Sequence, residues 1–76
     1  MQRTMVEDRL RAILAENERW LSRSDIARLM QRPHAMASWD ITVLEWLVSA
    51  GEVERRTEHY NGILTRHLYR KVARDG

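Results

Sequence analysis

The sequence predicts an α+β fold in which three helices are followed by a C-terminal two-stranded β-hairpin. Apolar residues recur at helical spacing in three segments that precede Gly51. Beyond Gly51 lie two segments that are typical of strands, and the Asn61-Gly62 pair between them is the strongest short-range signal for a hairpin turn. A short strand near Trp20-Leu21 is a further candidate element.

Size and composition favour one globular domain over residues 1–76, with an ordered core from about residue 4 to about residue 72. Hydrophobic residues make up 43% of the chain and charged residues 32%, which is ordinary for a globular protein. There is no Cys, so a disulfide framework and a thiolate metal site are excluded. The chain has no long apolar run and no apolar leader at its N-terminus, so we expect a cytoplasmic protein.

The first helix is predicted from about Met5 to Glu16, with Thr4 and Glu7 as a capping box at its start. Its core residues recur at helical spacing; they are Val6, Leu10, Ile13 and Leu14.

The second helix is predicted to begin with a capping box between Ser22 and Asp25 and to end near Gln31. Pro33 cannot continue a helix, because its ring removes the amide donor. Residues 32–37 are therefore expected to form the turn that leads to the third helix.

The third helix is predicted to start near Ser38 or a residue or two earlier, with Ser38 as a candidate cap. It should end at Gly51, which can adopt the left-handed backbone that ends a helix. The strands are then expected over residues 52–57 and 63–72. A two-residue turn would pair His59 with Leu64 and His67 with Arg56. The two histidines would then lie on opposite faces of the hairpin, so no shared metal ion is expected.

Positive charge is concentrated in the C-terminal third. Residues 1–54 carry seven Arg against nine acidic residues, whereas residues 55–74 carry six basic residues against Glu58 alone. A one-sided basic stretch is typical of proteins that bind polyanions, although a basic surface also serves solubility.

Three stretches resemble the winged-helix family of helix-turn-helix domains: "LSRSDIARLM", "VLEWLVSAGEVERR" and "TEHYNGILTRHLYRKV". The resemblance implies a third helix in the major groove of duplex DNA and a hairpin wing along the DNA backbone or minor groove. It assigns base-reading positions to the third helix, namely Ser38, Trp39, Thr42, Glu45 and Trp46. It assigns contacts with the DNA backbone to the wing residues Arg55, Arg56, Arg66, Arg70 and Lys71. It assigns contacts with flanking phosphates to Arg23, Arg28 and Arg32.

The element order and the basic C-terminal stretch together predict a dimeric prokaryotic or phage transcriptional regulator. No cofactor, metal or catalytic residue is expected, because the sequence contains no Gly-rich phosphate loop, nucleophile elbow or acid/base pair. Base readout by the third helix should be weak, because residues 38–50 contain no Lys, Arg, Asn or Gln. The wing is therefore expected to provide most of the affinity for DNA.

Two interpretations remain open for the helix stripe of Trp39, Val43 and Trp46. The tryptophans can belong to the core, which would be a large share of the buried area in so small a domain. Alternatively, the stripe is partly exposed and docks on a second copy or another protein, without DNA binding.

Overall fold

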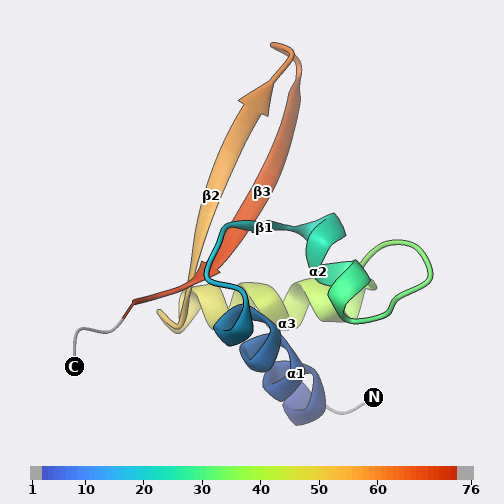
Figure 1. Cartoon of the computed structure of the whole chain (residues 1–76), viewed down its shortest axis with the longest axis vertical. Helices are drawn as coiled ribbons and strands as arrows, with labels where there is room; N and C mark the ends of the chain where they lie inside the picture. The colour runs from blue at the N-terminus through green and yellow to red at the C-terminus, as the bar shows by residue number, and fades with distance from the viewer. Residues whose placement is uncertain (1–2, 74–76) are drawn as a thin grey trace.

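The computed structural model describes residues 3–73 and has three helices and a three-stranded antiparallel sheet (Figure 1). The predicted α+β class is confirmed at this level. No helix among these residues is long and apolar enough to cross a membrane. In chain order the elements are α1 (Arg3–Glu16), β1 (Leu21–Ser22), α2 (Arg23–Leu29), α3 (Ser38–Ser49), β2 (Val53–Tyr60) and β3 (Leu64–Lys71).

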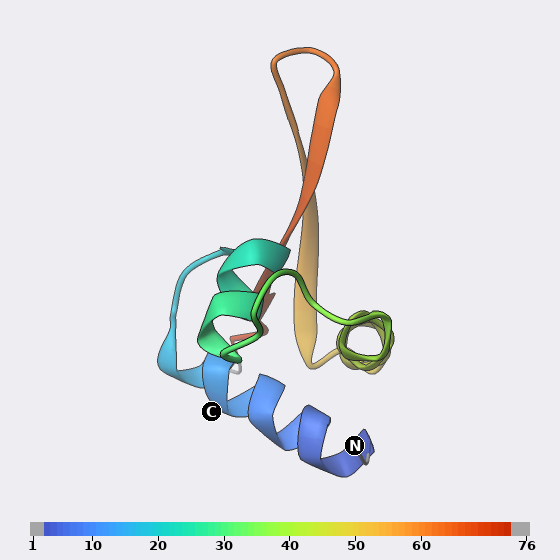
Figure 2. The ribbon, with the colours of Figure 1, turned by 90° about the vertical axis from the view of Figure 1, so that its right-hand side faces the viewer.

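The core lies where the three helices meet the base of the sheet. Apolar side chains of α1, α2, α3 and all three strands are buried together, and Tyr69 of β3 is fully buried among them. The outer half of the β2–β3 hairpin projects beyond the helices (Figures 1 and 2). Its residues therefore have both faces open to solvent.

The strand order is β1-β3-β2, and β2 pairs with β3 from Val53 opposite Lys71 to Tyr60 opposite Leu64. This register corrects the sequence prediction by one residue, because the connecting loop holds three residues, 61–63, and not two. Asn61 and Gly62 both have positive φ, at 55° and 70°, and Ile63 completes the loop.

The correct register places the two histidines on one face of the hairpin, which overturns the prediction that they lie on opposite faces. His67 lies opposite Thr57, and His59, two residues along β2, points to the same side. The Nδ1 atom of His67 is 3.2 Å from the Thr57 hydroxyl.

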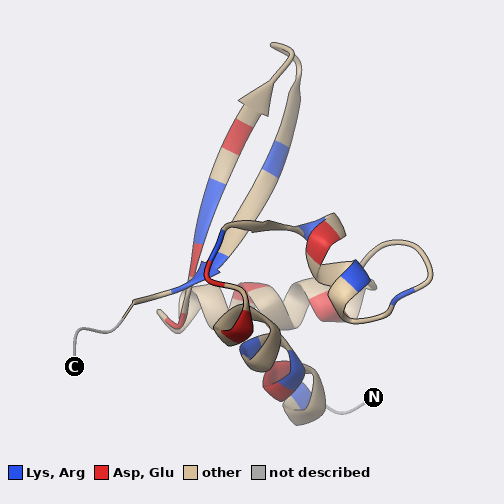
Figure 3. Ribbon diagram, in the orientation of Figure 1, with Lys and Arg blue, Asp and Glu red and all other residues tan. Residues whose placement is uncertain are grey.

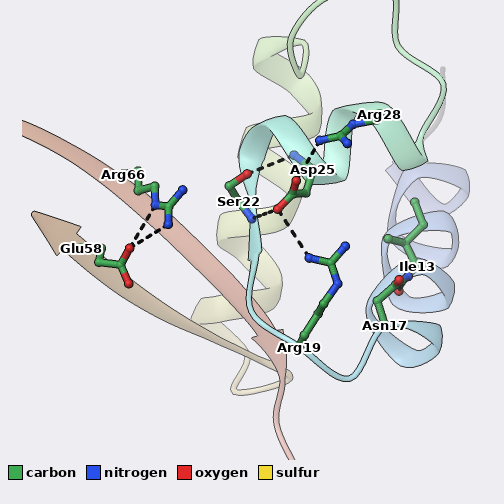
Figure 4. Close-up of polar contacts among 8 residues, drawn as sticks. All are labelled: Ile13, Asn17, Arg19, Ser22, Asp25, Arg28, Glu58 and Arg66. Carbon is green, nitrogen blue, oxygen red and sulfur yellow. Dashed lines mark hydrogen bonds and ion pairs between the residues drawn. The ribbon is translucent and has the colours of Figure 1, made fainter. Parts of the chain in front are cut away.

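The predicted capping box of α2 is confirmed (Figure 4). The Ser22 hydroxyl accepts a hydrogen bond from the Asp25 amide at 3.1 Å, and the Asp25 carboxylate accepts one from the Ser22 amide at 3.1 Å. Two amides that the helix cannot satisfy are thereby paired.

The other two predicted caps are wrong. Thr4 lies inside α1, and Glu7 instead pairs with Arg3, with Nε and Oε1 3.3 Å apart. Helix α3 is capped at Ala37, whose amide donates to the buried Asp40 carboxylate at 3.0 Å. The Ala37 amide is thus satisfied by the Asp40 carboxylate. Ser38 is the first residue of α3 and not its cap.

Helices α2 and α3 end in the same way. Gly51 has φ +80°, and the Glu52 amide donates to the Leu47 carbonyl at 3.0 Å, as predicted for a glycine that ends a helix. At the end of α2, Gln31 adopts the same left-handed backbone with φ 61°, and the Arg32 amide donates to the Ala27 carbonyl at 2.9 Å. Helix α2 thus ends near Gln31, as predicted, and its left-handed residue is one that has a Cβ.

Candidate nucleic-acid interface

The β2–β3 hairpin has two different faces, because opposite residues in an antiparallel pair point to the same side. One face carries only Arg as its basic residue type and is named here the arginine face. It consists of Glu54, Arg56, Glu58 and Tyr60 of β2 and Leu64, Arg66, Leu68 and Arg70 of β3. The other face holds Tyr69, both histidines and Arg55, and its base is covered by the core. The basic residues of the C-terminal third (Figure 3) are thus divided between two surfaces.

Aromatic rings lie between the guanidinium groups of the arginine face. The Cζ atoms of Arg56 and Arg70 lie 4.7 Å and 4.5 Å from the ring centroid of Trp20, the residue before β1. The Cζ atom of Arg66 lies 5.6 Å from the ring centroid of Tyr60. Such cation–π contacts fix the direction of each guanidinium group.

Glutamates on the same face pair with these arginines. Glu58 accepts hydrogen bonds from Arg66 at 2.9 Å and 3.1 Å (Figure 4) and from Arg56 at 3.2 Å. Glu54 accepts one from Arg70 at 3.1 Å. The arginine side chains stay 43–52% exposed, so these ion pairs are worth roughly 0–1 kcal/mol each. A phosphate can therefore replace the glutamates at small cost.

Arg55 points to the other side of the hairpin, where it forms an ion pair with Glu45 of α3. Tyr69 donates its hydroxyl proton to the same carboxylate at 2.7 Å, and Arg23 donates to the Tyr69 hydroxyl at 3.1 Å. Burial, together with the hydrogen bond to Glu45, raises the pKa of Tyr69 to about 12, so the phenol stays a donor at neutral pH. This cluster joins α2, α3, β2 and β3, and it holds the Glu45 carboxylate while leaving the side chain 29% exposed.

The two tryptophans of α3 lie on the exposed side of the helix and not in the core. Trp39 and Trp46 are 40% and 37% exposed and meet edge to face with centroids 5.4 Å apart. Val43, which was placed in the same stripe, is fully buried. The Cζ atom of Arg3 lies 4.1 Å from the Trp46 centroid, a neighbour that the sequence did not indicate.

The remaining base-reading candidates on α3 are small. Ser38 and Thr42 are exposed, and the Thr42 hydroxyl donates to the Ser38 carbonyl at 3.0 Å. The open surface of α3 thus offers hydroxyl groups and indole rings, and no cation of its own.

The arginines that were predicted to contact flanking phosphates differ in how strongly they are already bound to carboxylates. Arg28 is exposed and pairs with Asp25 at 2.9 Å. Arg32 binds both oxygens of Asp40, at 2.9 Å and 2.8 Å, and this contact raises the pKa of its guanidinium. Because the Asp40 side chain is only 1% exposed, we assign Arg32 a structural role. Lys71 is exposed at the base of the hairpin, opposite Val53.

Sequence reasoning missed Trp20 and Glu58 as parts of this surface. Trp20 is distant along the chain from the arginines it contacts, and only the pairing of β1 with β3 brings it over them. Within residues 3–73, no group of three or more His, Asp or Glu side chains could hold a metal ion.

Comparison of the chain with models of known families, with curated proteins and with solved structures finds no match.

Proposed function

We propose that this protein is a winged-helix domain that binds duplex DNA through the arginine face of its hairpin. The element order α1-β1-α2-α3-β2-β3 and the strand order β1-β3-β2 support this proposal. In this interpretation the hairpin is the wing and α3 is the helix that approaches the groove. A role in transcription regulation rests on the family resemblance.

The observation that carries the proposal is the array of Arg56, Arg66 and Arg70 on one projecting face, with Trp20 and Tyr60 between them. Guanidinium groups bind phosphate oxygens in a bidentate manner, and their hydrogen-bonding plane is here held by aromatic rings. Phosphate contacts of this kind position a protein on DNA without reading its sequence.

Base selection by α3 is expected to be weak. Glu45 is held by Arg55 and Tyr69, and the Thr42 hydroxyl has a partner within the helix. The exposed indole of Trp39 remains as a group that can contact a thymine methyl. The protein should therefore bind duplexes of different sequence with similar affinity.

The test is a fluorescence anisotropy titration of a labelled duplex at about 50 mM and 200 mM salt. Arg56→Ala combined with Arg66→Ala should weaken binding at least tenfold and lower the salt slope by about 2, since each phosphate contact contributes about 0.9. The matched control is Arg9→Ala with Arg11→Ala, which removes the same charge from α1. Equal binding by the two double variants, or no binding by the wild type at 50 mM salt, would refute the proposal.

A second candidate function is supported by the exposure of Trp39 and Trp46, which meet edge to face beside Arg3. Exposed aromatic residues next to an Arg are the residue types that anchor protein interfaces. The partner proposed here is a second copy of the chain. Sedimentation should then show a dimer that Trp39→Ala converts to a monomer with unchanged helical content. A monomeric wild type would exclude this candidate.

A further inference from the structure

Strand β2 has a long outer edge that, among residues 3–73, has no strand neighbour. It stands at the end of the strand order β1-β3-β2 and pairs with β3 alone, from Val53 to Tyr60. The outer half of this edge projects beyond the helices with the rest of the hairpin (Figures 1 and 2). The unpaired amides and carbonyls of such an edge are a template for pairing with another strand.

A second copy of the chain can pair with this edge in only a few symmetric registers. Directly opposite residues of antiparallel strands point to the same side of a sheet. A two-fold axis perpendicular to the sheet also keeps each residue on its own side, so the residue at the centre must face itself. Because β2 extends over residues 53–60, the two longest registers are centred on Arg56 and on Thr57.

The charges of β2 favour the register centred on Thr57. The register centred on Arg56 sets two Arg56 side chains against each other and Glu54 against Glu58 of the second copy. The register centred on Thr57 instead sets Arg56 against Glu58 of the second copy, and symmetry repeats this pair. Opposite charges that face each other across two strands stabilise a sheet, whereas like charges destabilise it. The remaining charged residues of this register face Tyr60, in the case of Glu54, and His59, in the case of Arg55.

Arg56 and Glu58 are free to make this exchange. Their side chains are 50% and 37% exposed, so their present contact with each other costs little to replace. Charged residues on an edge strand normally prevent pairing with other chains. In β2 the same charges oppose one long register and match the other, so they select a single partner geometry.

We propose that β2 pairs with β2 of a second copy of the chain, antiparallel and centred on Thr57. The two hairpins then form one four-stranded sheet in the order β3-β2-β2-β3. A two-stranded ribbon outside a core is only marginally stable, and pairing with further strands stabilises it. Both arginine faces lie on the same side of the joined sheet. This interface does not involve Trp39 or Trp46, and its formation does not require DNA.

The same register gives a partner to the exposed apolar tip of the hairpin. Ile63 is 89% exposed in the single chain. Continued past the end of β2, the register brings Ile63 to Gly51 of the second copy, at the turn between α3 and β2. The space beside Gly51 is open, because a Cβ built there would meet no atom within 4 Å. Ile63 is therefore removed from water at this turn, which favours association.

Thr57→Cys is the most direct test, because the chain has no Cys and residue 57 faces its own copy in the proposed dimer. Directly opposite Cα atoms in antiparallel strands are about 4.5–5.5 Å apart, which a disulfide can span. Thr65→Cys is the matched control, since Thr65 is also an exposed threonine on the same face but lies on β3. We expect Thr57→Cys to form disulfide-linked dimers about tenfold faster under mild oxidation. Equal rates for the two variants would overturn the proposal.

Charge reversal tests the register itself by sedimentation without DNA. The wild type should be a dimer, whereas Arg56→Glu and Glu58→Arg should each be monomeric, because each sets like charges against each other. An equimolar mixture of these two variants should form a heterodimer, since opposite charges then meet again. Glu16→Arg is the control, because it reverses an exposed charge on α1 and should leave the dimer intact.

The outcomes separate this proposal from the other two. Trp39→Ala should remain a dimer if β2 forms the interface. If Trp39→Ala is monomeric while both charge reversals stay dimeric, the β2 interface is wrong and the tryptophan contact is supported. A monomeric wild type, or a mixture that stays monomeric, also overturns the β2 interface. None of these results bears on duplex binding, which the anisotropy titrations test by themselves.

Discussion

The hydroxyl group of Tyr69 lies 2.7 Å from Oε2 of Glu45 and joins the base of the hairpin to α3. Tyr69 is fully buried. Glu45 also forms an ion pair with Arg55, and its Oε2 atom lies 3.7 Å from Nη2 of Arg23. A polar contact at the edge of the core thus links α3 to the hairpin, beside the apolar packing of Leu47 and Val53. In the proposed complex with DNA, this contact would help to hold the two elements in place against the duplex.

Tyr69→Phe should lower the free energy of unfolding by about 1.5 kcal/mol, because it removes a hydrogen bond to a charged group and leaves the ring in place. Urea denaturation monitored by circular dichroism measures this change. Tyr60→Phe is the matched control, since Tyr60 is exposed at the end of β2. Similar effects of the two substitutions would contradict the role given to the Tyr69 hydroxyl.

Gln31→Gly should stabilise the protein by about 1 kcal/mol, because Gln31 ends α2 with a left-handed backbone that disfavours a side chain. Gly51→Ala should destabilise it by a similar amount at the end of α3. A Cβ on Gly51 would meet no atom within 4 Å, so the cost there is one of backbone conformation. Thermal unfolding of the two variants should give shifts of opposite sign, and a destabilised Gln31→Gly variant would disprove this account.

Asp25 should make stability depend on pH in the acid range. The hydrogen bond from the Ser22 amide, aided by the Ser22 hydroxyl, Arg28 and Arg19, lowers the pKa of its carboxyl group. Its stabilising effect is therefore complete above the unfolded value of about 3.9 and is lost as the pH falls through the lowered folded value.

Asp25→Asn should accordingly cost about 1 kcal/mol at neutral pH, and the difference from the wild type should shrink in strongly acidic solution. Urea denaturation at several pH values between about 2 and 7 measures it. Asp8→Asn is the control, because the Asp8 side chain is 68% exposed. A difference between Asp25→Asn and wild type that does not change with pH would argue against a lowered pKa.

Glu58→Gln should strengthen duplex binding about threefold, since it removes a negative charge from the arginine face and releases an exposed ion pair. Its carboxylate now pairs with both Arg56 and Arg66. Glu16→Gln makes the same charge change at the end of α1 and should alter affinity far less. Anisotropy titrations at low salt give the comparison, and weaker binding by Glu58→Gln would count against the arginine face as the DNA contact.

The sequence itself determined those features that depend on neighbours in the chain. The capping box of Ser22 and Asp25 and the end of α3 at Gly51 follow from residues at most a few positions apart. The core positions of α1 follow from its periodicity, and the predicted Val6, Leu10, Ile13 and Leu14 are all buried. Such features form through hydrogen bonds and packing within one or two helical turns.

Only the tertiary structure decided which distant side chains meet. A third loop residue at the tip of the hairpin shifted the register by one and thereby moved the two histidines to the same face. The pairing of β1 with β3 brought Trp20 to Arg56 and Arg70, and the rotation of α3 buried Val43 but left Trp39 and Trp46 exposed. Local patterns cannot specify these choices, because each depends on strand pairing and helix packing between segments that are far apart in the chain.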